Sequence, residues 1–394
     1  MRILAIETSF DEAGLAIVDY EQTDNSTSIT VLADTLFSQA PHHAEYGGVY
    51  PTLARQIHSK SIVALLTQTL KQAHLHEPTP ASAVSADKLL EAQTILEREP
   101  EQFAQLSGLL TSIKRPDIDA IAITRGPGLE PALWVGITFA KALAHVWDIP
   151  LTAVNHMEGH VIAALAHSTG ENTFTIDKPA LPALALLISG AHTELVHIPK
   201  WLTYKKIGST RDDAVGEAFD KSARLLGLPY PGGPAISKLA QNARNEQLEQ
   251  PFTLPRPMST GASFDFSFSG LKTAVRNLVQ SIDAPTDEQK KQIAREFEDA
   301  VTDVLLAKTK RAIDEHGVQS LIVSGGVAAS AHIRAHMEQL AAQYENMHLY
   351  IPSRGLATDN GRMIAFAAAV HDAVPTNAID IVANGNLSIA SDKA

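Results

Sequence analysis

Residues 2–19 read RILAIETSFDEAGLAIVD, and this stretch decides the fold class. Two apolar runs, residues 3–6 and 15–18, flank a polar turn that holds Asp11 and Gly14, which predicts a β-hairpin. Residues 183–198, ALALLISGAHTELVHI, repeat this plan with a buried strand, a Ser-Gly turn and a second strand. Two such hairpins, about 180 residues apart, indicate an internal duplication with one hairpin in each of two domains.

Strand and helix patterns alternate along the rest of the chain, which favours an α/β fold. Residues 77–108 are rich in Ala, Glu, Gln, Ser and Pro, and they predict a surface insertion of one or two helices that carries no chemistry. The other predicted elements are helices at 56–73, 132–146 and 290–315, strands at 120–124, 151–154 and in SLIVSGG from Ser320, and a final helix after the TDNG motif.

The composition excludes several classes of protein. The 394 residues include 32 Lys and Arg against 44 Asp and Glu, a net charge of −12, so the chain does not coat nucleic acid or anionic membrane by itself. The absence of cysteine excludes disulfides, a thiolate nucleophile and a Cys–zinc site. The sequence has no evident leader or membrane span, and we therefore expect a cytoplasmic protein that does not bind membranes.

The sequence NHMEGH places His156 and His160 four residues apart. On a helix this spacing puts both imidazoles on one face, which suits a shared metal ion. A metallopeptidase of the HExxH type needs its Glu directly after the first His, and Glu158 is one position too late. Two histidines do not complete a metal site, and a buried pair without a metal is an equally good interpretation at this point.

Three glycine-rich loops follow predicted strands: ISGAH from Ile188, YPGGP from Tyr230 and VSGGVAAS from Val323. Glycines let a backbone approach a phosphate, so together the loops favour a nucleotide site, although each alone is consistent with a plain turn. Neither a P-loop nor a GxGxxG fingerprint is present. Acidic residues lie at the turns and strand ends: Glu7, Asp11, Glu12, Asp212, Asp213, Glu217, Asp220 and Asp359.

A series of motifs occurs in an order that resembles the TsaD family of tRNA adenosine threonylcarbamoyltransferases: IETSFDEAG, HAEYGGVYPTLA, RGPGL, NHMEGH, SGAHTEL, DDAVGEAFDKSARLLGLPYPGGP, FDFSFSGLKT, VSGGVAAS and TDNG. The resemblance implies an α/β, two-domain, actin/Hsp70/sugar-kinase-like fold, with a ribonuclease-H-like mixed sheet in each domain and a ligand cleft between them. It implies an N-terminal domain at 1–150, a C-terminal domain at 151–355, and a helix and tail at 356–394, of which the helix packs back on the N-terminal domain.

The resemblance also implies a reaction and its partners. The threonylcarbamoyl group passes from L-threonylcarbamoyladenylate to N6 of the adenosine immediately 3′ of the anticodon, in tRNAs that read codons beginning with A, and AMP is released. A paralogous TsaB-like protein and a TsaE-like ATPase are the implied partners. Basic residues that are candidates to line a tRNA-facing rim are Lys205, Lys206, Arg211, Arg256 and Lys272.

Carried over residue by residue, the family's metal ligands fall on His156, His160 and Asp359. This set suits one divalent ion, with Fe(II) favoured and Zn(II) as the alternative. The family's catalytically required aspartate falls on Asp11, and Glu12 is the next candidate for the catalytic base. The substrate-binding positions fall on Leu187, Ile188, Ser189, Gly190, Ala191, Asp220, Gly233 and Ser330.

Two departures from the family pattern bear on substrate binding. Ala191 replaces a usual glycine, which preserves the turn only if this position does not need a positive φ. Ser330 replaces a usual asparagine, so that an amide donor is lost and its contact is either absent or bridged by water. Phe10 replaces a common cysteine, where we expect an effect on packing alone, and Pro131 replaces a usual glycine after GPGL.

Three other functions compete with this interpretation. A metallopeptidase is disfavoured by the position of Glu158. A non-catalytic nucleotide-binding scaffold has no reason to retain a complete set of metal ligands. A sugar or small-molecule kinase of the same fold also holds a nucleotide between two hairpins, but a two-histidine metal site is foreign to it.

Overall fold

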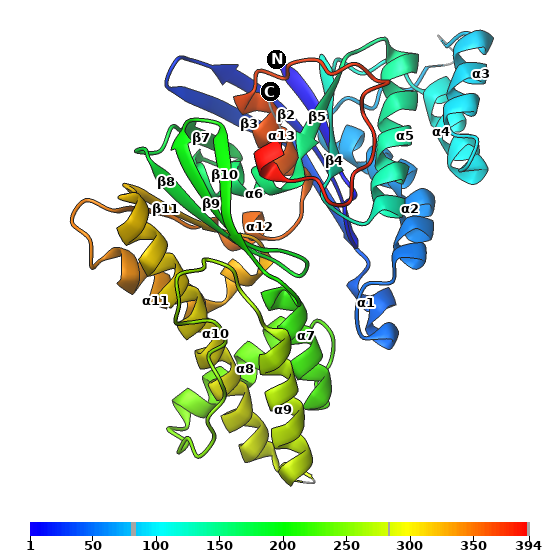
Figure 1. Ribbon diagram of the computed structural model, residues 1–394. Helices are drawn as coiled ribbons and strands as arrows, with labels where there is room; N and C mark the ends of the chain where they lie inside the picture. The colour runs from blue at the N-terminus through cyan, green and yellow to red at the C-terminus, as the bar shows by residue number, and fades with distance from the viewer. Residues whose placement is uncertain (80–83, 283, 392–394) are drawn as a thin grey trace. The chain divides into compact units, whose positions relative to one another are not determined.

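The computed structural model describes residues 1–79, 84–282 and 284–391 (Figure 1). The described residues form two compact units: unit 1 comprises Met1–Pro41, Val49–Lys178 and Asp359–Ala394, and unit 2 comprises His42–Gly48 and Pro179–Thr358. Residues 80–83 of the predicted insertion and 392–394 of the predicted tail lie outside the described residues. The domain boundaries at 150 and 355 stay a prediction.

Unit 1 is built on a seven-stranded mixed sheet with the strand order β5-β4-β1-β2-β3-β7-β6. The predicted first hairpin is confirmed, because β1 and β2 pair antiparallel with Ile3 opposite Val18. Strand β4 pairs parallel to β1, and β5 pairs parallel to β4. The strands are β1 (Arg2–Glu7), β2 (Glu12–Gln22), β3 (Ser26–Ser38), β4 (Ala120–Gly126), β5 (Leu151–Asn155), β6 (Ala166–Gly170) and β7 (Thr173–Asp177).

Helices of unit 1 pack against this sheet. Apolar side chains of α2, α4 and α5 share one buried core with β1, β2 and β4, and α13 packs against α6 and the strands β1 and β2. The predicted insertion forms α3 and α4, and Leu106 and Leu110 of α4 are buried in that core. The helices are α1 (Ala40–His43, which ends in unit 2), α2 (Pro51–Gln72), α3 (Ala86–Ile95), α4 (Pro100–Ser112), α5 (Glu130–Trp147), α6 (His156–Leu165), α13 (Gly361–Val370) and the 3-10 helix η3 (Ile389–Ser391).

Unit 2 repeats the topology of unit 1. Its five strands have the order β10-β9-β8-β11-β12, with β8, β9 and β10 antiparallel and β11 and β12 parallel to β8. This matches β3-β2-β1-β4-β5 of unit 1 in order and direction, so the α/β fold with a duplicated mixed sheet is confirmed. The strands are β8 (Ala183–Ile188), β9 (Thr193–Lys200), β10 (Thr203–Ser209), β11 (Ser320–Ser324) and β12 (His348–Tyr350).

The helices of unit 2 include the predicted long helix, which is α10. The helices are η1 (Ala44–Tyr46), α7 (Val215–Leu225), α8 (Gly232–Asn245), α9 (Ser269–Ile282), α10 (Asp287–His316), η2 (Gly326–Ala329), α11 (Ala331–Ala341) and α12 (Arg354–Ala357).

Among the helices in the described part of the chain, none is long and apolar enough to cross a bilayer.

Two glycines set the distance between α13 and β2 in unit 1. A Cβ on Gly361 would lie 2.6 Å from the backbone nitrogen of Ala16 and 2.6 Å from the carbonyl carbon of Leu15. A Cβ on Gly14 would in turn lie 2.5 Å from the backbone nitrogen of Gly361. Because neither backbone can yield as a flexible side chain would, both positions require glycine for close packing. This contact fixes the start of α13, two residues after Asp359.

We predict that Gly361→Ala lowers the free energy of unfolding by about 1–3 kcal/mol, because the added methyl group overpacks the contact with β2. Thermal unfolding followed by circular dichroism measures the effect. Gly108→Ala is the matched control, since a Cβ there meets nothing within 4 Å and alanine is the better helix former inside α4. Equal stability of the Gly361→Ala variant and the unsubstituted protein would contradict the prediction.

Candidate metal centre and glycine-rich loops

The histidine pair lies in the first turns of α6, as the NHMEGH motif predicts. The Asn155 side chain caps this helix by accepting hydrogen bonds from the backbone N–H groups of Met157 at 2.9 Å and Glu158 at 3.3 Å. His156 and His160 are 1% and 0% exposed, and their rings meet edge-on with centroids 4.8 Å apart. Gly159 brings α6 close to α13, because a Cβ there would lie 3.3 Å from the Met363 side chain.

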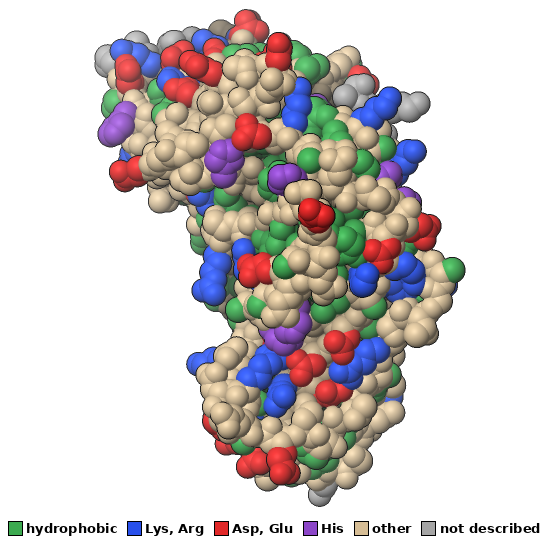
Figure 2. Space-filling model, turned by 90° about the vertical axis from the view of Figure 1, so that its left-hand side faces the viewer, with side chains coloured by type: hydrophobic (Ala, Val, Ile, Leu, Met, Phe, Trp, Pro, Cys, Tyr) green, Lys and Arg blue, Asp and Glu red, His purple; other side chains and the backbone are tan. Residues whose placement is uncertain are grey.

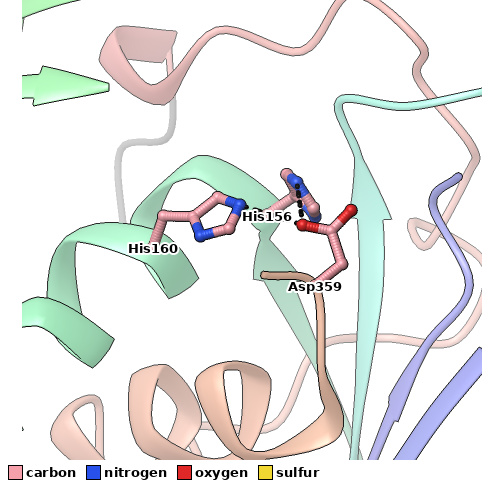
Figure 3. Close-up of side chains that lie close together, drawn as sticks. All are labelled: His156, His160 and Asp359. Carbon is pink, nitrogen blue, oxygen red and sulfur yellow. Dashed lines mark ion pairs between the residues drawn. The ribbon is translucent and has the colours of Figure 1, made fainter. Parts of the chain in front are cut away.

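Asp359 reaches the same point from the segment before α13 (Figure 3). Its Oδ1 atom lies 3.0 Å from Nε2 of His160 and 3.6 Å from Nε2 of His156. The ligand atoms of these three residues lie within 4.8 Å of one another, so they could hold one metal ion. Two imidazole nitrogens and a carboxylate oxygen suit Fe(II) and Zn(II) alike, and the donor set does not distinguish them.

The turn of the first hairpin lies against this metal centre. The Ser9 hydroxyl is 3.0 Å from Nδ1 of His156, and the Phe10 ring packs edge-on against the same imidazole with centroids 5.6 Å apart. Asp11 is 9% exposed, and its backbone carbonyl accepts a hydrogen bond from the Gln39 N–H at 2.9 Å. The predicted catalytic turn and the predicted metal ligands are therefore neighbours in unit 1.

The charges of this region shift two titrations. Burial lowers the pKa of His156, but the nearby charges of Asp359 and Glu7 outweigh that effect and raise this pKa to about 9. Burial, together with the charges of Asp11 and Asp359, raises the pKa of Glu12 well above its usual value. Several carboxylates thus share a site in which a positive charge is favourable.

Glu158 pairs with a histidine outside the metal centre. Its Oε1 atom lies 2.9 Å from Nε2 of His371, just beyond the end of α13, and its side chain is 9% exposed. This ion pair joins α6 to α13. The metallopeptidase interpretation is weakened further, because that chemistry needs the carboxylate beside a metal-bound water.

Two buried residues, Glu7 next to His156 and Thr124 next to Glu7, were given no role by the sequence analysis. The Glu7 carboxylate lies 3.3 Å from Nδ1 of His156, and the Thr124 hydroxyl donates to Glu7 at 2.5 Å. Both residues are 0% exposed. The sequence feature that could have indicated Glu7 is its position directly after the apolar run of residues 3–6.

In unit 2, the loops after β8 and β11 lie at the same edge of the sheet because these strands are parallel neighbours. A Cβ on Gly325, whose φ is +94°, would lie 2.5 Å from the backbone oxygen of Ile188. A Cβ on Gly216, at the start of α7, would lie 2.7 Å from the backbone oxygen of Ser189. The end of β8 (Leu187 and Ile188) and the turn after it (Ser189, Gly190 and Ala191) therefore pack against both the VSGGVAAS loop and α7.

The turn itself accommodates Ala191. The Ser189 hydroxyl accepts hydrogen bonds from the N–H groups of Ala191 at 3.4 Å and His192 at 3.1 Å. Neither Gly190 nor Ala191 has a positive φ. The replacement of glycine by alanine at position 191 therefore costs no backbone strain.

The third glycine-rich loop joins the same helix through Asp220. Oδ1 of Asp220 accepts a hydrogen bond from the Gly232 N–H at 2.7 Å, and a Cβ on Gly232 would lie 2.7 Å from Cα of Asp220. Gly233 faces open space, since a Cβ there would meet nothing within 4 Å. The three glycine-rich loops thus gather around α7.

Ser330 and the acidic residues Asp212 and Asp213 form hydrogen bonds or ion pairs within unit 2. The Ser330 side chain caps α11 by accepting from the Ile333 N–H at 3.4 Å, and its hydroxyl donates to the buried Glu298 at 3.3 Å. Asp212 accepts a hydrogen bond from the Phe268 N–H at 2.8 Å, and Asp213 pairs with Lys221. These contacts give Asp212 and Asp213 roles in unit 2 outside the metal centre.

We predict that Asp359→Ala and His160→Ala weaken metal binding by more than about 100-fold, because loss of a ligand costs more than loss of a supporting residue. The measurement is metal content per chain after loading with Fe(II) or Zn(II) and gel filtration. The control is His167→Ala, which changes a surface histidine that also faces an aspartate, Asp177. Retention of the full metal content by Asp359→Ala would show that the ion binds elsewhere.

Comparison with known proteins identifies the family of this chain. A family model described as "TsaD: tRNA N6-adenosine threonylcarbamoyltransferase" matches residues 30–84 and 109–366. The match includes the three metal-ligand candidates and the unit 2 loops, whereas Asp11 and Glu12 precede it. The interruption at residues 85–108 falls within the predicted insertion.

Two solved structures are similar to the chain, and both are of HypF. Full-length HypF in the phosphate- and nucleotide-bound form has 13% identity and a TM-score of 0.47, over 71% of this chain and 42% of that chain. T. kodakarensis HypF has 15% identity and a TM-score of 0.44, over 71% and 43%. The chain spans less than half the length of these HypF chains. From the family match over most of its own length, the chain belongs to the TsaD family of tRNA N6-adenosine threonylcarbamoyltransferases.

Proposed function

We propose that the chain transfers the threonylcarbamoyl group of L-threonylcarbamoyladenylate to N6 of the adenosine immediately 3′ of the anticodon, in tRNAs that read codons beginning with A. The observation that carries this proposal is the buried His156–His160–Asp359 centre, with the Asp11 turn beside it, in a chain of the TsaD family. A scaffold that only binds nucleotide would not need a buried set of metal ligands next to a carboxylate turn.

The reaction requires one proton acceptor. The adenine N6 amine attacks the carbamoyl carbon, a C–N bond forms, and the bond from that carbon to the phosphate oxygen breaks. AMP leaves with the bonding electron pair, and the proton lost from N6 passes to a carboxylate. The N6 lone pair is delocalised into the ring, so a positioned base accelerates the step. We assign this role to Asp11, with Glu12 as the alternative.

Two buried residues, His58 and Gln39, hold the turn that carries Asp11. The Nε2–H of His58 donates to the backbone carbonyl of Phe10 at 2.8 Å, which leaves Nδ1 of His58 to accept from the Gln39 amide at 3.0 Å. His58 and Gln39 are both 0% exposed. A base that is held in place before the substrate arrives lowers the entropic cost of reaching the transition state.

The loops of unit 2 are assigned to the adenylate. Backbone N–H groups of glycine-rich loops suit its phosphate, and carboxylates suit ribose hydroxyls. We propose that Leu187, Ile188, Ser189, Gly190, Ala191, Asp220 and Gly233 form this subsite. Because the Ser330 hydroxyl already donates to Glu298, we propose that Ser330 contacts the adenylate only through water or through its backbone.

The divalent ion, Fe(II) or Zn(II), would be held by His156, His160 and Asp359, and would supply positive charge that stabilises the phosphate or the carbonyl oxygen of the donor. The other two tasks of the proposed transfer belong to side chains and backbone of this chain. Asp11 takes the proton, and the unit 2 loops bind the adenylate.

We further propose that tRNA binding depends on a TsaB-like paralogue and a TsaE-like ATPase in the cytoplasm. The net charge is −12, and on the face drawn in Figure 2 the Lys and Arg side chains are interspersed with Asp and Glu. Three of the predicted rim cations are held in ion pairs: Lys206 with Glu194, Arg211 with Asp265, and Arg256 with Glu296. Such pairing leaves less positive charge for phosphates.

The direct test of the activity is reconstitution with unmodified tRNA. We predict that metal-loaded protein, L-threonylcarbamoyladenylate and both partners yield N6-threonylcarbamoyladenosine and AMP, as detected by mass spectrometry of digested tRNA. The yield falls when either partner is omitted. Formation of AMP without modified adenosine, or a tRNA that stays unmodified with every component present, would contradict the proposal.

We predict that Asp11→Asn slows transfer by about 100-fold or more, the contribution typical of a general base. Single-turnover transfer from preformed adenylate measures the rate, and equilibrium binding of the adenylate should be unchanged because the amide keeps the shape of the carboxylate. The control is Asp19→Asn on the same hairpin, where the carboxylate pairs with Arg2. Transfer by Asp11→Asn at the unsubstituted rate would move the assignment to Glu12.

A further inference from the structure

Glu7 is a fully buried carboxylate at the carboxyl end of β1, where its charge is compensated by few neighbours. One oxygen, Oε1, accepts a hydrogen bond from the Ser9 N–H at 2.6 Å. The other, Oε2, accepts from the Thr124 hydroxyl at 2.5 Å and lies 3.3 Å from Nδ1 of His156. Of the cationic side chains that the structure describes, His156 is the one that forms an ion pair with Glu7. A buried carboxylate is costly without such compensation.

This geometry favours the tautomer of His156 that carries its proton on Nδ1. If Nδ1 were unprotonated, its lone pair would face the lone pairs of Oε2, and the contact would be repulsive. With a proton on Nδ1, the imidazole donates toward Glu7 or the Ser9 hydroxyl, which lies 3.0 Å away. Nε2 then keeps its lone pair, and this is the atom that lies 3.6 Å from Asp359.

We infer that Glu7 is a positioning residue of the metal centre: it holds the proton of His156 on Nδ1 and thereby keeps Nε2 available to bind the ion. A carboxylate behind a ligating imidazole also fixes the ring orientation and makes the ligand more basic. The inference rests on the proposed metal site, and it gives the Glu of the IETS motif a defined chemical role.

The loop after β4 holds this arrangement in place. The backbone oxygen of Ser9 accepts a hydrogen bond from the Leu129 N–H at 2.7 Å. A Cβ on Gly128, whose φ is +158°, would lie 2.7 Å from both Cβ and the backbone oxygen of Ser9. The RGPGL motif therefore packs directly on the residue whose N–H and hydroxyl contact Glu7 and His156. Thr124, which bonds the other oxygen of Glu7, precedes this motif by one residue.

The test is the dissociation constant of Zn(II), measured by competition with a chromophoric chelator. We expect Glu7→Gln to weaken zinc binding by about 10–100-fold, the effect typical of removing a supporting carboxylate. Thr124→Val keeps the size of the side chain and removes its hydrogen bond to Glu7, so we expect a smaller weakening in the same direction. This second variant keeps the inference testable if Glu7→Gln does not fold.

The matched control is Glu158→Gln. It changes another buried carboxylate that contacts an imidazole, that of His371, on the same helix as the metal ligands. We expect Glu158→Gln to bind zinc as tightly as the unsubstituted protein, even if its thermal stability falls. An equal loss of zinc affinity in Glu7→Gln and Glu158→Gln would mean that Glu7 affects zinc binding only through the stability of the fold.

Nitrogen-15 NMR of histidine side chains in the zinc-loaded protein reads the protonation directly. We expect His156 to be protonated on Nδ1 and zinc-bound through Nε2. Zinc bound through Nδ1 of His156, or an unchanged zinc affinity of Glu7→Gln, would overturn the inference. A loaded unsubstituted protein that binds no zinc at these histidines would instead refute the proposed metal centre, which separates the two failures.

Discussion

Convergence of two buried imidazoles on one carboxylate oxygen is the interaction on which the rest of unit 1 depends. His156 and His160 both direct Nε2 toward Oδ1 of Asp359, in a place where both imidazoles are almost completely shielded from water. The carboxylates nearby raise the pKa of His156 to about 9. Burial of this much negative charge is favourable only with a compensating positive charge, which a divalent ion supplies.

The surrounding structure brings three distant segments to that point. Asn155 caps α6 and Asn360 caps α13, so each metal-ligand segment begins at a fixed helix terminus. Gly14, Gly361 and Gly159 allow the backbones of β2, α6 and α13 to approach closely. The first hairpin turn, which also carries Asp11, then places Ser9 and Phe10 against His156. Gly14, Gly159 and Gly361 are thus explained by the close approach of backbones. Ser9 is explained by its contact with His156.

Local patterns in the sequence were sufficient for much of this arrangement. Pairs of apolar runs on either side of a turn predicted both hairpins, and the spacing of His156 and His160 predicted one helix face. The third ligand could not be found this way, because Asp359 lies about 200 residues away and only the family resemblance connected it to the histidines. The same limit hid Glu7, whose role depends on contacts with Thr124 and His156 across the sheet. The hydrogen bond from Ser330 to Glu298 could not be predicted from local patterns either, because Glu298 lies in α10 and Ser330 caps α11.

X-ray absorption spectroscopy at the metal edge of the loaded protein tests the central claim most directly. The account predicts one ion per chain, with two imidazole nitrogens and at least one carboxylate oxygen as its protein ligands. It also predicts loss of one imidazole from the spectrum of His160→Ala, recorded at a metal concentration that saturates the weakened site. A coordination shell without histidine nitrogen, or one that is unchanged in His160→Ala, would contradict the account.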